Sequence, residues 1–95
     1  MLNINGREWA IIVVSPFSEH LRKSDGTFTV GVCDNSLGTI FIASGLSLVF
    51  LKEVLCHEIA HAAMFSYDIS LSAEQEEVVA DLIAMYGEEI IDVTD

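Results

Sequence analysis

The chain has 95 residues, of which 52% are hydrophobic and 20% are charged. This length and composition predict a single folded domain over residues 1–95 and exclude a disordered chain. Fifteen acidic residues against four basic ones give a formal net charge of −11. A surface this negative repels nucleic acid and anionic membranes, so neither is expected as a partner.

The cysteine content and the N-terminus indicate an intracellular protein. Cys33 and Cys56 are too few for a disulfide framework, and each is expected to be a small buried hydrophobic residue. The N-terminus lacks the basic segment and long apolar run of a signal peptide. The longest uninterrupted apolar run, Trp9 to Val14, is too short to span a bilayer. We therefore expect a cytoplasmic location.

The first half of the chain predicts three strands. Glu8 to Ser15 is rich in β-branched and aromatic residues and ends at Pro16, which favours a largely buried strand. Thr27 to Cys33 alternates between apolar and polar residues and predicts a second strand. The turn residues Asp34 to Gly38 then lead into Thr39 to Ala43, so the second and third strands are expected to form a β-hairpin.

A long apolar segment free of glycine and proline, Leu48 to about Phe65, predicts a buried helix with Ser47 as its N-cap. It contains the motif His57-Glu58-Ile59-Ala60-His61. Helical residues four apart point to the same side, so both imidazoles can reach one metal ion. Glu58 lies about 100° around the helix from His57. It can therefore miss the metal and still reach a water bound to it.

A second helix is predicted to begin at Ser72, with Gln75 as its capping-box partner. It is expected to run to about Tyr86, because Gly87 is a natural C-terminal stop. Residues 88–95 either continue the helix or fray. The order strand, strand, strand, helix, helix predicts an α+β fold, with the helices packed on one face of a small three-stranded sheet.

The second helix is expected to supply a third metal ligand, because catalytic zinc usually takes three protein ligands and keeps one position for water. Helical geometry places Glu77 and Asp81 on one side of this helix. The same side carries apolar side chains and is expected to face the core: Val78, Leu82 and Met85. Glu76 is expected to project into solvent. We therefore predict Glu77 as the third ligand and Asp81 as the hydrogen-bond partner of a bound histidine, in the first place His57.

At these residues the chain resembles the gluzincin metallopeptidases, which carry HExxH on one helix and Glu-x-x-x-Asp on the next. The second motif is here Glu77-Val78-Val79-Ala80-Asp81. The resemblance implies zinc bound by His57, His61 and Glu77, with Glu58 as the catalytic carboxylate and Asp81 supporting a ligand. It also implies a zincin-like arrangement, in which a sheet edge beside the active helix holds an extended peptide. The short hairpin that leads into the helix, within residues 38–61, is similar to compact peptidases of phages and mobile elements, the ImmA/IrrE type.

The resulting prediction is a zinc-dependent metallopeptidase that hydrolyses a protein or peptide substrate. Water activated by the metal attacks the carbonyl, and Glu58 moves the proton to the leaving amine. Candidate donors to the oxyanion are His20, Tyr67 and Tyr86, and Tyr67 is preferred because it closely follows the active helix. Backbone groups of Thr39 to Ala43 are expected to bind substrate by strand addition.

Two other functions stay open at this point. The protein could be a catalytically inactive metal-binding module, or an acidic inhibitor that mimics DNA or blocks a basic protein surface. Metal binding alone does not separate these functions, because a small domain gains much stability from a bound metal. The presence of Glu58 favours catalysis, since a purely structural site has no need of that carboxylate. The sequence indicates neither a cleavage specificity nor an oligomeric state.

Overall fold

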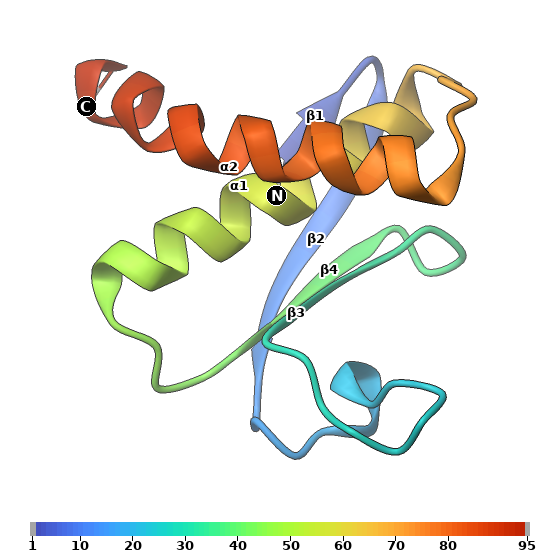
Figure 1. Ribbon diagram of the computed structural model, residues 1–95, viewed down its shortest axis with the longest axis vertical. Helices are drawn as coiled ribbons and strands as arrows, with labels where there is room; N and C mark the ends of the chain where they lie inside the picture. Colours follow the sequence, from blue (N-terminus) through green and yellow to red (C-terminus); the bar gives the residue numbers. More distant parts are fainter. Residues whose placement is uncertain (1, 95) are drawn as a thin grey trace.

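The computed structural model describes the backbone of residues 2–94 and the side chains of residues 2–84. The fold is α+β, with a four-stranded mixed sheet and two helices. In chain order the elements are β1 (Leu2–Ile4), β2 (Arg7–Val14), the 3-10 helix η1 (Glu19–Leu21), β3 (Gly31–Asp34), β4 (Thr39–Ala43), α1 (Leu48–Ser66) and α2 (Ala73–Thr94). The strand order is β1-β2-β4-β3, with β2 and β4 parallel and the two outer pairs antiparallel (Figure 1).

The additional strand β1 corrects the expectation of three strands. Asn5 and Gly6 fold β1 back onto β2, and both have positive φ angles of 50° and 82°. Asn-Gly is a typical signal for a two-residue hairpin turn. The strand before it has only three residues, Leu2–Ile4. So short a segment is too brief to show the alternation that identifies a strand in a sequence.

The predicted hairpin is confirmed, but its first strand starts later than expected. β3 pairs antiparallel with β4 over Gly31–Asp34. The preceding residues instead pair with the backbone around η1: the Thr29 N–H donates to the Leu21 carbonyl at 2.9 Å, and the Lys23 N–H donates to the Thr27 carbonyl at 2.7 Å. β3 therefore begins at Gly31, and the first half of the predicted strand, residues 27–30, precedes it.

The sheet packs against other elements on both faces around β4, which is buried along its whole length. One face packs against α1, with the buried core residues Trp9, Ile40, Ile42, Val54 and Ala62. The other face packs against η1, with Leu21, Phe41 and Ala43. α2 packs on α1, so the two helices meet each other along a long contact (Figure 1). The candidate residues of α1 and α2 are thereby brought face to face.

The helix starts follow the sequence signals. The Ser47 hydroxyl accepts from the Phe50 N–H at 3.3 Å, as expected for an N-cap. The capping box also forms, because the Ser72 N–H donates to Gln75 Oε1 at 3.1 Å and the Gln75 N–H donates to the Ser72 hydroxyl at 3.2 Å. The predicted stop at Gly87 is wrong, since α2 continues to Thr94. A glycine inside a helix costs only about 1 kcal/mol relative to alanine. Within the described residues, no helix has the length and apolar character needed to cross a membrane.

Candidate metal centre

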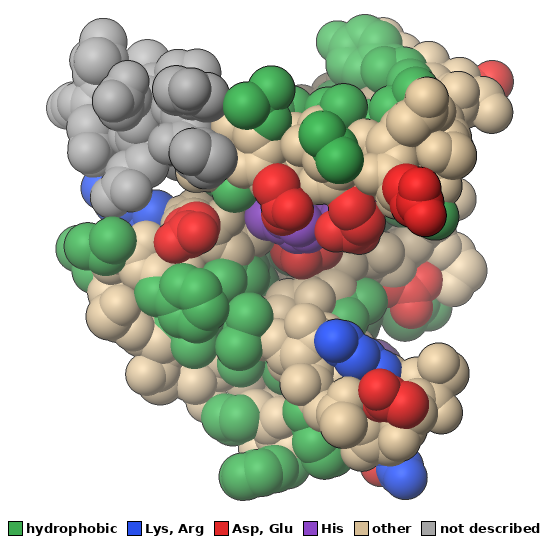
Figure 2. Space-filling view, in the orientation of Figure 1, with side chains coloured by type: hydrophobic (Ala, Val, Ile, Leu, Met, Phe, Trp, Pro, Cys, Tyr) green, Lys and Arg blue, Asp and Glu red, His purple; other side chains and the backbone are tan. Residues whose placement is uncertain are grey.

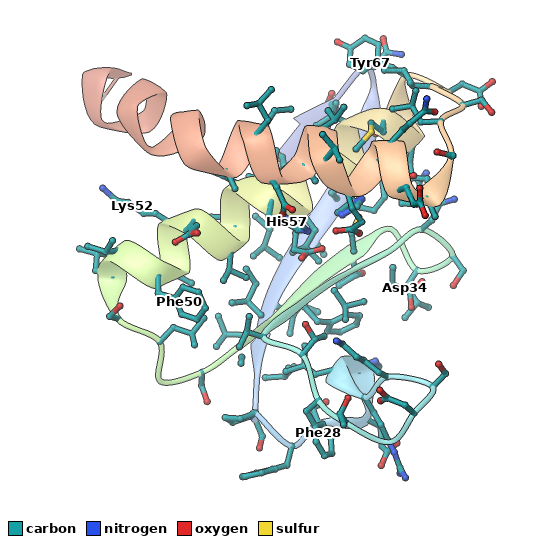
Figure 3. All side chains as sticks on the ribbon, in the orientation of Figure 1. Phe28, Asp34, Phe50, Lys52, His57 and Tyr67 are labelled. Carbon is teal, nitrogen blue, oxygen red and sulfur yellow. The ribbon has the colours of Figure 1, made fainter. Side chains whose placement is uncertain are left out.

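His57 and His61 lie one turn apart on α1, and their Nε2 atoms are 3.2 Å apart. Figure 3 shows His57 on α1 beneath α2. Glu77 of α2 reaches both rings. Its Oε2 is 3.4 Å from His57 Nε2, and its Oε1 is 3.3 Å from His61 Nε2. The ligand atoms offered by these three residues all lie within 4.8 Å of one another. The structure thus brings the three predicted ligands together.

Each of the two imidazoles is held at its other nitrogen by a carboxylate of α2. His57 Nδ1 lies 3.1 Å from Asp81 Oδ1, and His61 Nδ1 lies 2.6 Å from Glu76 Oε1. An ionised carboxylate can only accept hydrogen bonds. His61 Nδ1 is therefore the donor in its hydrogen bond with Glu76, and His57 Nδ1 lies in an ion-pair contact with Asp81. The Nε2 atoms of the two rings face each other and the Glu77 carboxylate.

This donor set fits a transition-metal cation. Two lone pairs and a carboxylate at such short range repel one another unless a positive charge lies between them. Zinc takes imidazole nitrogen and carboxylate oxygen at about 2.0–2.1 Å, and two ligands at that distance in tetrahedral geometry lie about 3.3 Å apart. The three separations measured here are 3.2, 3.3 and 3.4 Å. The two distances to Glu77 join different oxygens of its carboxylate, and one ligand atom from each residue lies within 4.8 Å of the other two. His57, His61 and Glu77 are therefore close enough together to be ligands of one cation.

The inner face of α2 differs from the predicted one. Ala80 and Ala84 are buried, whereas Val78 and Leu82 are 67% and 53% exposed. Small alanines let two helices approach closely, and Ala80 packs here against the buried Ala60 and Met64 of α1. The expectation that the larger apolar residues face the core was therefore wrong; the side chain of Met85, also expected there, lies outside the described residues.

The shifted face changes the role of Glu76. Glu76 lies one turn before Ala80, on the inner face, and its side chain is 23% exposed. The expectation of a solvent-facing Glu76 was therefore wrong, and its contact with His61 is the site interaction that sequence reasoning missed. Glu77 and Asp81 lie on the flank of the same face, with side chains 60% and 71% exposed, and reach the rings from there. The sequence signal that could have revealed the inner face of α2 was the spacing of Ala80 and Ala84, two small residues four positions apart.

Glu58 is buried between α1 and β3, with 7% of its surface exposed. Burial is the main cause that raises the pKa of Glu58; the two histidine rings and a hydrogen bond from the Cys33 backbone N–H oppose that rise. Gly31 of β3 makes the close approach possible. A Cβ at position 31 would lie 3.1 Å from Glu58 Cγ and Oε2, and 2.7 Å from Val54 Cγ1. Cys33 therefore holds the Glu58 carboxylate by a backbone hydrogen bond, and Gly31 leaves the space that Glu58 occupies.

Two hollows meet at Glu58. One has a volume of about 300 Å³ and lies between residues 29–31 and α1, with Phe50, Val54, His57 and Asp81 in its walls. The other has a volume of about 260 Å³ and is lined by Cys33, His61, Phe65, Glu76 and Glu77. Neither is lined by lysine or arginine among the described residues. Figure 2 shows the acidic side chains gathered around the histidines below α2.

The structure does not bring His20 or Tyr67, two of the three candidate oxyanion donors, to the histidine pair. Tyr67 caps the C-terminus of α1, is 57% exposed and lines neither hollow; Figure 3 shows it well apart from His57. His20 stacks on Phe41 with ring centroids 4.0 Å apart. Phe41 belongs to the sheet face that packs on η1, so His20 lies across the sheet from the site. The side chain of Tyr86 lies outside the described residues.

The strand expected to bind substrate, Thr39–Ala43, is β4, and it lies between β2 and β3. That expectation was wrong, because a central strand has both edges paired already. β3 is the edge strand beside α1. The Ala43 N–H donates to the Val30 carbonyl at 2.9 Å. By the alternation of an antiparallel pair, the backbone groups of Gly31 and Cys33 then face away from β4.

Both cysteines are free thiols, as expected. Cys56 is buried, whereas Cys33 is only partly buried and borders the smaller hollow. Burial raises the pKa of the Cys33 thiol to about 12. In the metal-free protein this thiol therefore stays protonated at neutral pH.

Comparison of the chain with protein-family models, with curated proteins and with solved structures gave no match.

Proposed function

We propose that this protein is a zinc-dependent peptidase with a minimal zincin-like architecture. The observation that supports this most is the convergence of His57 Nε2, His61 Nε2 and the Glu77 carboxylate at 3.2 to 3.4 Å, with both Nδ1 atoms held by carboxylates. Zinc bound by these three residues supplies a Lewis acid that activates water and polarises a carbonyl. A buried glutamate beside the pair completes the set of groups needed for hydrolysis.

Glu58 is the proposed general base and acid. Its carboxylate takes the proton of the attacking water and delivers it to the leaving amine. Burial raises the pKa of Glu58, and a carboxylate with a raised pKa holds a proton more readily during transfer. The Cys33 N–H and the missing side chain at Gly31 keep this group between the two hollows.

The proposed substrate is an extended peptide laid along β3. The backbone groups of Gly31 and the Cys33 carbonyl face the edge of the sheet, where a strand can add, whereas the Cys33 N–H donates to Glu58. The larger hollow, walled by Phe50 and Val54, offers a place for an apolar side chain next to His57. The surrounding carboxylates and the net charge of −11 favour a substrate with basic residues.

The test uses wild type and Glu58→Gln, each stripped with a chelator and reloaded with zinc, against a peptide library. We expect wild type to bind one zinc ion and to cleave. Glu58→Gln should bind zinc equally well and lose about 10²–10⁴-fold in turnover, the usual contribution of general acid–base catalysis. Glu8→Gln, at an exposed glutamate of β2, is the matched control and should keep full activity.

The other outcomes discriminate between the remaining functions. If both proteins bind zinc and neither cleaves, the centre belongs to a binding module. If wild type binds no stoichiometric metal and His57→Ala behaves identically, the metal centre is refuted and an acidic inhibitor becomes the better hypothesis. Equal cleavage by wild type and Glu58→Gln would refute the role of Glu58.

A further inference from the structure

β2 is only partly covered by its neighbour β1. Leu2–Ile4 pair with Arg7, Glu8 and Trp9 on one side of β2. On the other side, β4 pairs with residues 10–14. Within residues 2–94, the segment from Ile11 to Val14 therefore has a strand on one side and none on the other (Figure 1).

The backbone of this segment presents hydrogen-bonding groups at the open side. The Ala10 N–H donates to the Gly38 carbonyl at 3.0 Å, and the Val14 carbonyl accepts from the Ser44 N–H at 2.8 Å. Backbone direction alternates along a strand. The N–H and C=O groups of Ile11 and Val13, between these two residues, therefore point away from β4, toward the open edge.

The side chains around this edge are aliphatic and exposed on both faces of the sheet. Ile11 and Val13 lie in register with Ile40 and Ile42, hence on the α1 face, and are 42% and 61% exposed. Ile12 lies on the opposite face and is 45% exposed. Natural edge strands are usually protected by charges, prolines or bulges. None of these lies within Ile11–Val14.

The charge distribution selects the kind of partner. The chain carries a net charge of −11, yet residues 9–18 contain no charged side chain. A basic partner would find nothing to pair with at this edge and would be drawn to the acidic face instead. The edge fits an uncharged, aliphatic, extended segment. β2 itself has that chemistry, and an antiparallel pairing of two identical strands satisfies the outward groups of both.

We propose that two copies of this chain associate through their β2 edges. Ile11 of each copy pairs with Val13 of the other, and the two Ile12 residues meet at the twofold axis. The sheet then runs continuously through both copies. The metal centre lies toward β3, at the other end of the strand order, so both centres stay open. The proposal is independent of the function proposed for that centre.

The test is the mass of the purified protein in solution as a function of concentration, by sedimentation equilibrium. We expect the mass to rise from the monomer value of 10.4 kDa to twice that value. Salt should tighten the dimer, because it screens the repulsion between two acidic copies. Val13→Lys should weaken dimerisation at least tenfold. Val78→Lys, at a valine of similar exposure on α2 (67% against 61%), is the matched control and should dimerise like wild type.

A cross-link tests the pairing itself. Opposed residues at a non-hydrogen-bonded antiparallel position have Cα atoms about 4.5 Å apart, within reach of a disulfide. Ile12→Cys should therefore form a covalent dimer on mild oxidation, whereas Leu48→Cys, at a residue 69% exposed on α1, should not. A wild type that is monomeric at every concentration overturns the proposal. So does a dimer that Val78→Lys dissociates and Val13→Lys leaves intact.

Discussion

At the scale of single residues, the two nitrogens of each imidazole have different partners, because Nδ1 contacts an outer carboxylate and Nε2 lies in the candidate metal site. Nδ1 of His57 and of His61 each contacts a carboxylate of α2, and both Nε2 atoms lie beside Glu77. Such outer partners orient the ring and raise the basicity of the nitrogen that binds metal. The shorter of the two contacts, 2.6 Å, belongs to the less exposed carboxylate, Glu76.

Glu76→Gln should therefore weaken zinc binding. The amide oxygen can still accept from His61 Nδ1, but the charge that raises the basicity of the ring is lost. We expect zinc affinity to fall about 10–100-fold, the usual effect of losing an outer carboxylate. Competition with a fluorescent zinc chelator measures it. Glu74→Gln removes an exposed carboxylate from the first turn of the same helix and should change affinity little; equal losses in both variants would contradict the role of Glu76.

At the scale of elements, the centre is made by two close approaches. Ala80 and Ala84 let α2 lie against α1, which brings three acidic side chains of α2 to the histidines. Gly31 lets β3 lie against α1, which leaves room for Glu58. Small residues decide both contacts, because any larger side chain would separate the elements and move the charged groups with them.

Gly31→Ala should damage both stability and activity. The added methyl would meet Val54 Cγ1 at 2.7 Å and Glu58 at 3.1 Å, and overpacking of this kind costs about 1–3 kcal/mol. Thermal unfolding and peptide cleavage measure the two effects. Adding Val54→Ala should relieve part of the strain, so the double variant should be more stable than the sum of the two single losses predicts.

Gly26→Ala is the contrasting control for this position. Its backbone has a φ of 87° and open space around the missing Cβ, so the substitution strains a surface turn without moving Glu58. It should lower the melting temperature and leave the cleavage rate unchanged. If Gly31→Ala behaves the same way, with full activity, then the close approach of β3 does not position the carboxylate.

At the scale of the whole molecule, a small acidic domain tolerates a buried carboxylate next to its proposed metal site. A raised pKa means that folding favours the protonated form of Glu58. The folded chain then holds this proton to a higher pH than the unfolded chain does. Ionised Glu58 consequently lowers the free energy of unfolding at pH values above its ordinary pKa. This loss of stability reaches its full size above the raised pKa of the folded state.

Glu58→Gln should therefore melt at a higher temperature than wild type at neutral pH, when both are metal-free. The difference should shrink as pH falls through the raised pKa and vanish below the ordinary value, where Glu58 is neutral in both states. Melting curves in chelator across pH 3–8, a range set to bracket the ordinary carboxyl pKa of about 4.3, test this. If the difference in melting temperature between Glu58→Gln and wild type stays constant with pH, or widens toward acid, then ionised Glu58 does not destabilise the fold.

Much of the local structure could be read from the sequence, because its causes are local. The caps at Ser47 and Ser72 and the span of β4 follow from hydrogen bonds and side-chain patterns among neighbouring residues. The spacing of His57 and His61 within a helix places both rings on one side. β1 was missed because three residues carry too little pattern.

The sequence by itself determined the α+β composition, the turns and helix starts, and the pairing of two histidines on one helix, since each depends on residues a few positions apart. Only the tertiary structure decided that β4 is central and β3 is the edge, that α2 turns Glu76 inward, and that β2 keeps an open side. The physical reason is that strand order and helix phase depend on packing between segments distant in the chain, where alanines and glycines set how closely backbones approach.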